Sequence, residues 1–166
     1  KVVYNKIDKK RFNRKVKGDR IIKKYNLKGN KILLYVGRIA PHKGIHLLVE
    51  SFNIVKKQIP NAKLLIVGKP TFNDYFAKLK KMADGNVIFT GFVEDNELPS
   101  YYAACDVYAT ASLWEGFNLP AAEAQACGKP VAAFNIGSHP EVVKNGILVE
   151  KGNVKKFSDA VIKLLR

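Results

Sequence analysis

Two segments of the chain combine glycines with charged side chains in a way that could serve chemistry. The first, "YVGRIAPHKG" (35–44), follows an apolar run and carries Arg38 and Lys43, but it matches neither GxGxxG nor GxxxxGK[ST]. Gly37 lets the chain turn where the run ends, and two cations beside that turn could bind a diphosphate. Taken alone, the segment also suits a solvated turn, where arginine and lysine are common.

The second segment, "WEGFNLPAAEAQACGKPV", places Glu115 in a loop and Glu123 in a helix. Asn118 suits the N-cap of that helix, and Gly128 suits the position just after its end. The free N–H groups at such a helix start bind an anion without any side chain. The alternatives are that Glu123 is a first-turn acid that interacts with the helix dipole, and that Glu115 is a surface carboxylate.

Apolar runs alternate with amphipathic stretches along the whole chain. The runs are apolar throughout rather than at every second residue, which is typical of parallel strands covered on both faces. This pattern predicts a doubly wound, Rossmann-like α/β domain with helices on both faces of a parallel sheet. The predicted strands are 31–37, 62–68, 86–91, 106–110, 130–134 and 147–150, and the predicted helices are 19–25, 45–59, 73–83, 97–105, 119–127 and 154–164.

In such a sheet, ligands bind outside the carboxyl ends of the strands. The loops that follow the predicted strands hold both charged segments, the single tryptophan, and the stretches "KPTF", "GFVEDNE" and "NIGSHPE". Each loop alone is weak evidence. Their convergence on one edge predicts a site there, and neither alternative for the two glutamates explains why they share that edge with Arg38 and Lys43.

The first 18 residues are polar and basic, and they predict a connector with one short strand at Val2–Tyr4. Residues 19–166 then form the domain, which is long enough to bury a core of ordinary size. Because the chain starts at Lys1 rather than Met, we expect a piece of a longer protein or a processed one.

The net charge of +15 raises nucleic acids, anionic lipids and phosphorylated ligands as partners. Only five of the 29 basic residues are arginine, the residue preferred for reading base edges, so we discount sequence-specific nucleic-acid binding. Cys105 and Cys127 lie among alanines, which indicates buried thiols in a reducing compartment. No apolar run reaches the roughly 18 residues that a membrane span needs.

Several motifs together resemble a known family. "EGFNLPAAEAQACGKPV" is similar to the EGFGLPxxEAxAxGxPV segment of the retaining glycosyltransferases of family four, the glycogen-synthase-like group with two Rossmann-type domains. "VGRIAPHKG" resembles the GRLxxxKG of that family. "VIFTGFVEDNELPSYYAACDVYATAS", "IGSHPEVVKNGILVEKGN" and "VVYNKIDKKRF" resemble further segments of its second domain. The resemblance covers essentially the whole chain.

The resemblance implies a C-terminal donor domain that binds a nucleoside-diphosphate sugar, with the acceptor domain absent. Arg38 and Lys43 would hold the donor diphosphate as it leaves, and Glu115 would contact hydroxyls of the donor sugar. Glu123 would bind the ribose. The remaining implied donor-binding residues supply turns, backbone N–H groups and the base pocket: Gly37, Gly91, Phe92, Val93, Gly116, Phe117, Asn118 and Leu119.

Two positions depart from the family pattern. Asn118 replaces a glycine, which puts close approach of a phosphate in doubt although asparagine tolerates left-handed backbone. Ala111–Ser112 replaces Pro-Ser, which weakens a role for Ser112. Residues 101–108 are expected in the core, Trp114 is expected to pack its loop, and His139 is hypothesised, with Glu141, to approach the donor.

The implied reaction is retaining, metal-independent transfer of a hexose, from a donor such as a UDP-, GDP- or ADP-sugar, to a sugar or lipid-linked acceptor. No cofactor or DxD metal pair is expected, since two cations can replace a metal. We expect a cytoplasmic enzyme of carbohydrate biosynthesis, with the basic charge allowing peripheral contact with the anionic inner face of the membrane.

Other functions stay open from the sequence. One is a nucleotide-sugar epimerase or a phosphorylase on the same scaffold, although no site for a pyridoxal-phosphate lysine is evident. The other is a basic binding module for anionic lipid or nucleic acid. Polyanion binding would weaken steeply with salt, whereas binding of a nucleotide-sugar would not.

Overall fold

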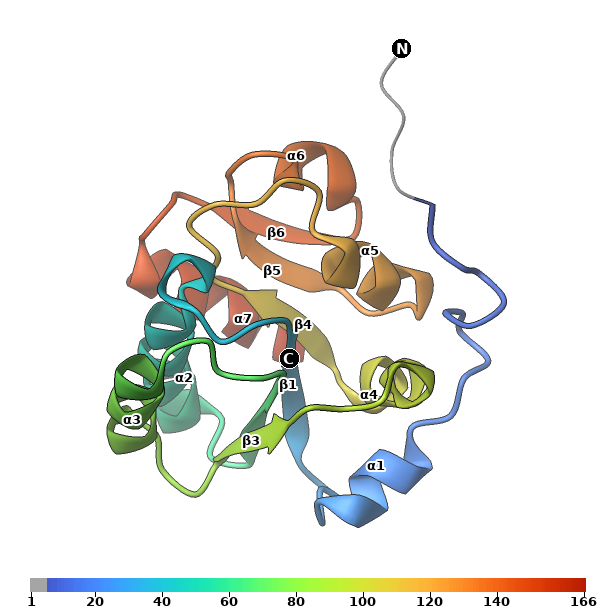
Figure 1. Cartoon of the computed structure of the whole chain (residues 1–166), viewed down its shortest axis with the longest axis horizontal. Helices are drawn as coiled ribbons and strands as arrows, with labels where there is room; N and C mark the ends of the chain where they lie inside the picture. Colours follow the sequence, from blue (N-terminus) through green and yellow to red (C-terminus); the bar gives the residue numbers. More distant parts are fainter. Residues whose placement is uncertain (1–5) are drawn as a thin grey trace.

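Within residues 6–166, six strands lie side by side in one parallel sheet, in the order β3-β2-β1-β4-β5-β6 (Figure 1). The structure is a computed structural model that describes residues 6–166, so the strand predicted at Val2–Tyr4 lies outside the described residues. The prediction of a parallel sheet is confirmed. The strands are β1 (Lys31–Val36), β2 (Ala62–Val67), β3 (Val87–Gly91), β4 (Val107–Thr110), β5 (Val131–Phe134) and β6 (Gly146–Val149).

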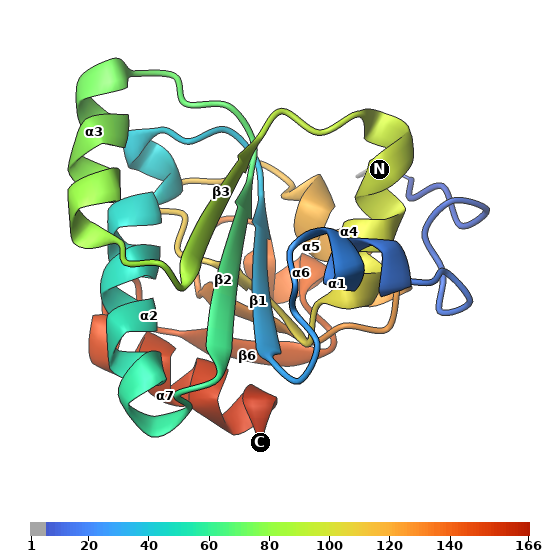
Figure 2. The same ribbon diagram turned by 90° about the horizontal axis from the view of Figure 1, so that it is seen from below.

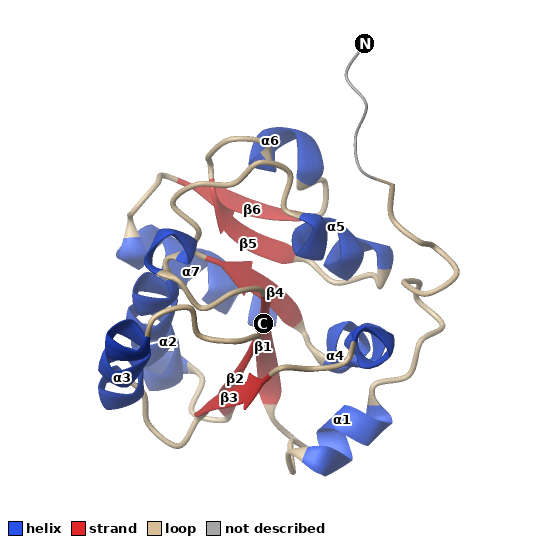
Figure 3. Cartoon of the chain, viewed as in Figure 1, coloured by secondary structure: helices blue, strands red, loops and turns tan. Residues whose placement is uncertain are grey.

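Helices cover both faces of the sheet, as Figures 2 and 3 show. One face carries α2, α3 and α7, and the other carries α1, α4 and α5. Short turns of 3-10 helix, η1 (Pro41–Lys43) and η2 (Asp95–Glu97), lie in the loops after β1 and β3. The α-helices are α1 (Asp19–Lys24), α2 (Ile45–Gln58), α3 (Asn73–Met82), α4 (Leu98–Ala104), α5 (Leu119–Ala126), α6 (His139–Val142) and α7 (Val154–Leu165).

The strands separate two cores because successive side chains point to opposite faces. Leu33 of β1 packs in the core under α2 and α7, whereas its neighbour Leu34 packs in the core under α4 and α5. Residues 101–108 contribute three buried tyrosines to the second core, as predicted, and the thiols of Cys105 and Cys127 are buried there too. Burial raises the pKa of Cys105 to about 12, so this thiol is protonated and inert near neutral pH.

The basic segment 6–18 forms neither a helix nor a strand, but it packs on the second core. Phe12 is 2% exposed and lies edge-on against the ring of Tyr102, with the ring centroids 5.7 Å apart. This contact ties the segment to α4. The boundary between connector and domain at residue 18 stays a prediction.

The strand order reverses between β1 and β4, which are neighbours in the sheet although β2 and β3 lie between them in the chain. Ligands of open α/β sheets bind at such a reversal, because the loops after the two strands turn to opposite faces and leave a crevice. The loops here are 37–44 and 111–118, the two charged segments of the sequence. The fold therefore brings both to the reversal point.

Gly44 lets these two loops touch. It has φ +64°, and a Cβ atom there would lie 1.8 Å from the carbonyl oxygen of Ala111. Beside this contact, the N–H of Leu113 donates to the carbonyl of His42 over 2.9 Å. Glycine is thus required by the backbone angle and by the space.

Gly44→Ala should be strongly destabilising, because it adds both left-handed strain and an overlap with backbone. We expect the free energy of unfolding to fall by about 2 to 4 kcal/mol, measured by urea denaturation. Gly85→Ala is the control, since a Cβ at Gly85 meets nothing within 4 Å. Equal urea midpoints for the two variants would contradict the close approach.

Candidate functional site

The two cations after β1 lie in different surroundings. Arg38 is exposed, and its carbonyl accepts a hydrogen bond of 2.9 Å from the hydroxyl of buried Tyr35. The side chain of Lys43 is only 18% exposed, and its Nζ lies 2.8 Å from Oε1 of Glu115. The alternative of a solvated turn therefore fits Arg38. It does not fit Lys43, which forms an ion pair with Glu115 in the loop after β4.

Glu115 is held by its own loop as well as by Lys43. Its side chain is 10% exposed, and the hydroxyl of Ser112 donates to Oε1 over 2.8 Å. Ser112 in turn lies 3.1 Å from the hydroxyl of Thr110, at the end of β4. The departure from Pro-Ser weakens the prediction of a role for Ser112, yet its hydroxyl orients the carboxylate in the structure. Within residues 6–166, no donor is hydrogen-bonded to Oε2, so that oxygen is available to a ligand.

The start of α5 has the predicted capping. Asn118 has φ +65°, and its Oδ1 accepts a hydrogen bond of 3.3 Å from the N–H of Ala121. Gly128 follows the helix end with φ +82°, also as predicted. The N–H groups of Asn118 and Leu119 lie at the first turn, where the helix itself offers no acceptor. Asparagine thus takes the left-handed conformation of the family's glycine.

Glu123 lies beyond the first turn of α5, so the alternative of a dipole-paired acid does not apply. Its Oε2 accepts a hydrogen bond of 2.8 Å from the hydroxyl of Tyr102. Burial raises the pKa of Glu123, and the Tyr102 hydroxyl and nearby Arg11 oppose that rise. Arg11 itself pairs with Asp95 over 2.9 Å. The segment before the domain therefore places a cation near this carboxylate.

A cavity of about 290 Å³ opens beside Arg38 and reaches the loop after β3. Phe92, Val93 and Gly37 line it, whereas Gly91 ends β3 just outside its walls. The sequence missed Lys69, whose Nζ lies 4.9 Å from the centre of the exposed Phe92 ring. The signal that could have found Lys69 was its position directly after β2. The lining residues are Val36, Gly37, Arg38, Val67, Gly68, Lys69, Phe92, Val93 and Leu98.

The other residues predicted near the site are either exposed or held by hydrogen bonds inside the fold. Gly116 is exposed, and the carbonyl of Phe117 accepts a hydrogen bond of 3.0 Å from the Ser138 hydroxyl. The prediction that Trp114 packs its loop is wrong, because this side chain is 70% exposed. The hypothesis that His139 approaches a ligand is wrong as well, since the residue is fully buried.

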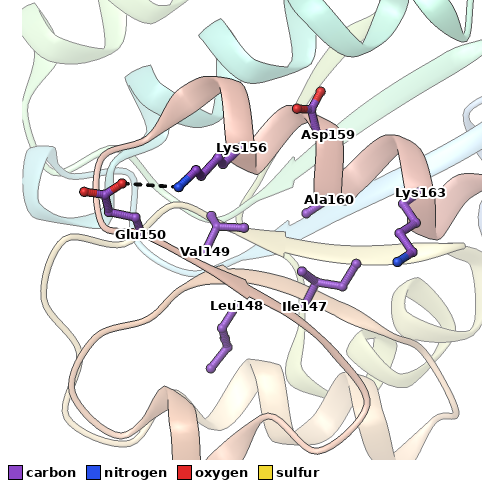
Figure 4. Close-up of a pocket in the computed structure, with 8 residues that line it drawn as sticks. All are labelled: Ile147, Leu148, Val149, Glu150, Lys156, Asp159, Ala160 and Lys163. Atoms are coloured by element: carbon purple, nitrogen blue, oxygen red, sulfur yellow. Dashed lines mark ion pairs between the residues drawn. The ribbon is translucent and has the colours of Figure 1, made fainter.

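A larger cavity, of about 410 Å³, lies between the edge strand β6 and α7 (Figure 4). Glu150 and Lys156 form an ion pair of 3.7 Å at one end of it. None of the residues predicted for the site lines this cavity. The predicted residues instead gather around the strand-order reversal: Arg38, Lys43, Glu115 and Asn118 through direct contacts or adjacent loops, and Phe92 through the smaller cavity.

Glu123→Gln should stabilise the chain at neutral pH. Because burial raises the pKa of Glu123, the folded state binds its proton more tightly than the unfolded state. The stability that this proton confers is lost as pH rises through the folded pKa. Glutamine stays neutral and keeps an acceptor for Tyr102. We therefore expect the variant to exceed wild type in free energy of unfolding at pH 7, with the difference closing below pH 4.5, the ordinary glutamate value.

Urea denaturation from pH 4 to pH 7 measures this difference, with the exposed Glu94→Gln as the control. A Glu123→Gln variant that is less stable than wild type at neutral pH would show that the carboxylate stabilises the fold.

The chain is similar to known proteins in both sequence and fold. The model of the family described as "Glycosyl transferases group 1" matches residues 18–166. A GDP-mannose-dependent alpha-(1-6)-phosphatidylinositol monomannoside mannosyltransferase of Mycobacterium tuberculosis is 34% identical over 158 residues, which cover 86% of this chain and 40% of that protein.

Two solved structures have the same fold. Anabaena HepE in complex with UDP-glucose superposes with a TM-score of 0.85 at 27% identity, over 98% of this chain and 46% of that one. The C-terminal domain of the group 1 glycosyl transferase LpcC from Francisella tularensis superposes with a TM-score of 0.84 at 29% identity, over 96% of this chain and 88% of that one.

The chain spans only 33% to 40% of the length of curated relatives that it matches. Its similarity is thus to one domain of larger proteins, and the LpcC structure shows such a domain on its own. Since the family model covers all but the first 17 residues, the chain belongs to the glycosyl transferases group 1 family.

Proposed function

We propose that this chain is the donor-binding domain of a retaining, metal-independent glycosyltransferase. The observation that carries the proposal is the meeting of two loops at the strand-order reversal. There the Lys43–Glu115 ion pair, Arg38 and the start of α5 share one edge of the sheet. Cations and helix N–H groups are the partners that a diphosphate requires.

The chemistry of transfer suits these groups. Departure of the sugar leaves negative charge on the diphosphate, which Arg38, Lys43 and the N–H groups of Asn118 and Leu119 would stabilise. A fixed donor of this kind is typically worth about 3 to 4 kcal/mol in the transition state. Two side-chain cations supply the positive charge that a metal supplies elsewhere. The assignment of retention follows from the resemblance to family four.

The carboxylates would recognise hydroxyls of the donor. With Oε1 of Glu115 occupied by Lys43 and Ser112, Oε2 is placed to accept from the sugar. Glu123 would accept from the ribose, with its other oxygen held by Tyr102. The cavity beside Phe92 and Val93 would take the base, next to Gly91.

Only the ligands named for relatives indicate which base and which sugar the donor carries. HepE binds UDP-glucose, whereas the mycobacterial relative is named as dependent on GDP-mannose. A hexose from a UDP-, GDP- or ADP-sugar is therefore the substrate class that we propose. No cofactor is part of the proposal.

The acceptor would bind mainly to a second domain, since the relatives are more than twice as long as this chain. An acceptor attached to a lipid fits the net charge of +15, which would favour an anionic membrane surface at the cytoplasmic face. No helix within residues 6–166 has the length and apolar character to cross a membrane.

Arg38→Ala is the sharpest test of the diphosphate site. Arg38 is exposed, so its loss should change the free energy of unfolding by less than about 0.5 kcal/mol. Loss of a charge-assisted contact should weaken nucleoside-diphosphate binding about ten- to hundred-fold. Lys43→Ala cannot separate loss of binding from loss of stability, because it would also leave the nearly buried Glu115 without its cation.

Calorimetry with UDP, GDP and ADP measures this loss. The control is Arg166→Ala, which removes the same charge from the end of α7, where Arg166 contacts Gln58. Unchanged affinity for every diphosphate that wild type binds would refute a role for Arg38. Binding that falls steeply with salt for any polyanion would favour the basic binding module instead.

The isolated chain should bind donor but transfer sugar poorly, because we propose that the acceptor binds mainly to a second domain. A radiolabelled-sugar assay with the donor that stabilises the chain best in a thermal-shift panel measures transfer. Addition of the remaining domain in the full-length protein is the positive control. Efficient transfer by the 166-residue chain alone would contradict the two-domain proposal.

A further inference from the structure

A chain of buried hydrogen bonds links the end of β5 to the start of α5. Nδ1 of His139 lies 2.7 Å from the carbonyl oxygen of Phe134, and its Nε2 lies 2.9 Å from Nδ2 of Asn118. Oδ1 of Asn118 accepts from the N–H of Ala121 over 3.3 Å. His139 is fully buried and Asn118 is 8% exposed, so water does not compete for these bonds.

The chemistry of the groups fixes the direction of every bond. Because Oδ1 of Asn118 faces the N–H of Ala121, its Nδ2 must face His139, and an amide nitrogen can only donate. Nε2 of His139 therefore accepts, which places the ring proton on Nδ1, where it donates to the Phe134 carbonyl. A proton on Nε2 would set two donors against each other in a buried site.

The loop after β5, which leads into His139, supports the loop before α5 (residues 111–118) at two further points. The Ser138 hydroxyl donates to the carbonyl of Phe117 over 3.0 Å. Gly137 has φ +48°, and a Cβ there would lie 2.5 Å from the carbonyl oxygen of Glu115. The loop after β5 thus lies directly against the backbone of residues 115–118.

We propose that His139 is a positioning residue of the donor site, a role that rests on the proposed function. A non-glycine residue with φ +65° is in a strained region of backbone, and a glycine would adopt it freely. The bonds to His139 and Ala121 hold Asn118 there. His139 therefore fixes the first turn of α5 and, with it, the N–H of Leu119 that would face the diphosphate. It acts through Asn118 without touching the ligand.

The tautomer of His139 is testable without any ligand. Two-bond ¹⁵N–¹H correlation spectra at pH 7 distinguish a proton on Nδ1 from one on Nε2, and a neutral ring from a charged one. We expect neutral His139 with the proton on Nδ1. The variants His42→Phe, His46→Phe and His139→Phe assign the three histidine signals. An Nε2–H tautomer or a charged ring would overturn the hydrogen-bond chain.

The positioning role is testable by a double-mutant cycle. His139→Phe keeps an aromatic ring and removes both hydrogen bonds. We expect it to weaken the best-binding diphosphate among UDP, GDP and ADP about ten-fold, and to leave binding of the matching nucleoside unchanged. In an Asn118→Gly background the same substitution should cost no further affinity, because glycine needs no anchor at this backbone angle.

His46→Phe is the matched control. The His46 ring also forms a hydrogen bond, of 2.7 Å to the Tyr75 hydroxyl, but this contact joins α2 to α3 and does not involve Asn118. Its diphosphate affinity should equal that of wild type. Equal losses from His139→Phe in both backgrounds would overturn the positioning role, since they would show that His139 acts independently of Asn118.

The two proposals fail in different ways. If the wild-type chain binds none of UDP, GDP and ADP, the proposed function fails, and the donor-site role of His139 fails with it. If a diphosphate binds but the tautomer or the cycle disagrees, only the role of His139 fails. Should His139→Phe not fold, the tautomer of the wild-type chain still decides the hydrogen-bond chain.

Discussion

The backbone of Gly44 passes so close to the Ala111 carbonyl that no side chain fits between them, and the candidate site depends on that contact. The loops after β1 and β4 would otherwise diverge to opposite faces of the sheet. Held together, they place Lys43 within 2.8 Å of Glu115. The sheet supplies the crevice, and this one close approach turns it into a site with paired charges.

Several groups of the site oppose the stability of the fold. Glu123 is a carboxylate whose burial disfavours its charged form, and Asn118 has a backbone angle that suits glycine. Each is held by a specific partner, Tyr102 for the carboxylate and His139 for the asparagine. Groups that are costly to the fold and are nonetheless well supported are typical of ligand sites. The same features would be unusual in a surface that serves only as a solvated edge.

Local patterns predicted much of the architecture. Continuous apolar runs between amphipathic stretches specify a parallel sheet because each strand must bury both faces, and Asn118 and Gly128 identify the ends of α5 because capping is a local interaction. The Lys43–Glu115 pair joins positions 72 residues apart, and no spacing in the sequence reveals it.

The two wrong predictions, for His139 and Trp114, also concern contacts between distant segments. His139 was placed at the correct edge, but whether it faces a ligand or the interior depends on the loop packed over it, which the sequence does not show. Trp114 is expected to be covered because large aromatic residues usually are, yet it is 70% exposed in the structure. Side-chain orientation depends on contacts between distant segments, whereas strand and helix positions depend on neighbours in the chain.

Chemical-shift mapping shows directly whether a nucleoside diphosphate binds where the loops after β1 and β4 meet. The ¹⁵N-labelled chain would be titrated with whichever of UDP, GDP and ADP binds best. We predict that amide shifts concentrate in residues 37–44, 91–93 and 115–123. Shifts confined to β6 and α7, around the larger cavity lined by Ile147 and Lys163, would contradict it.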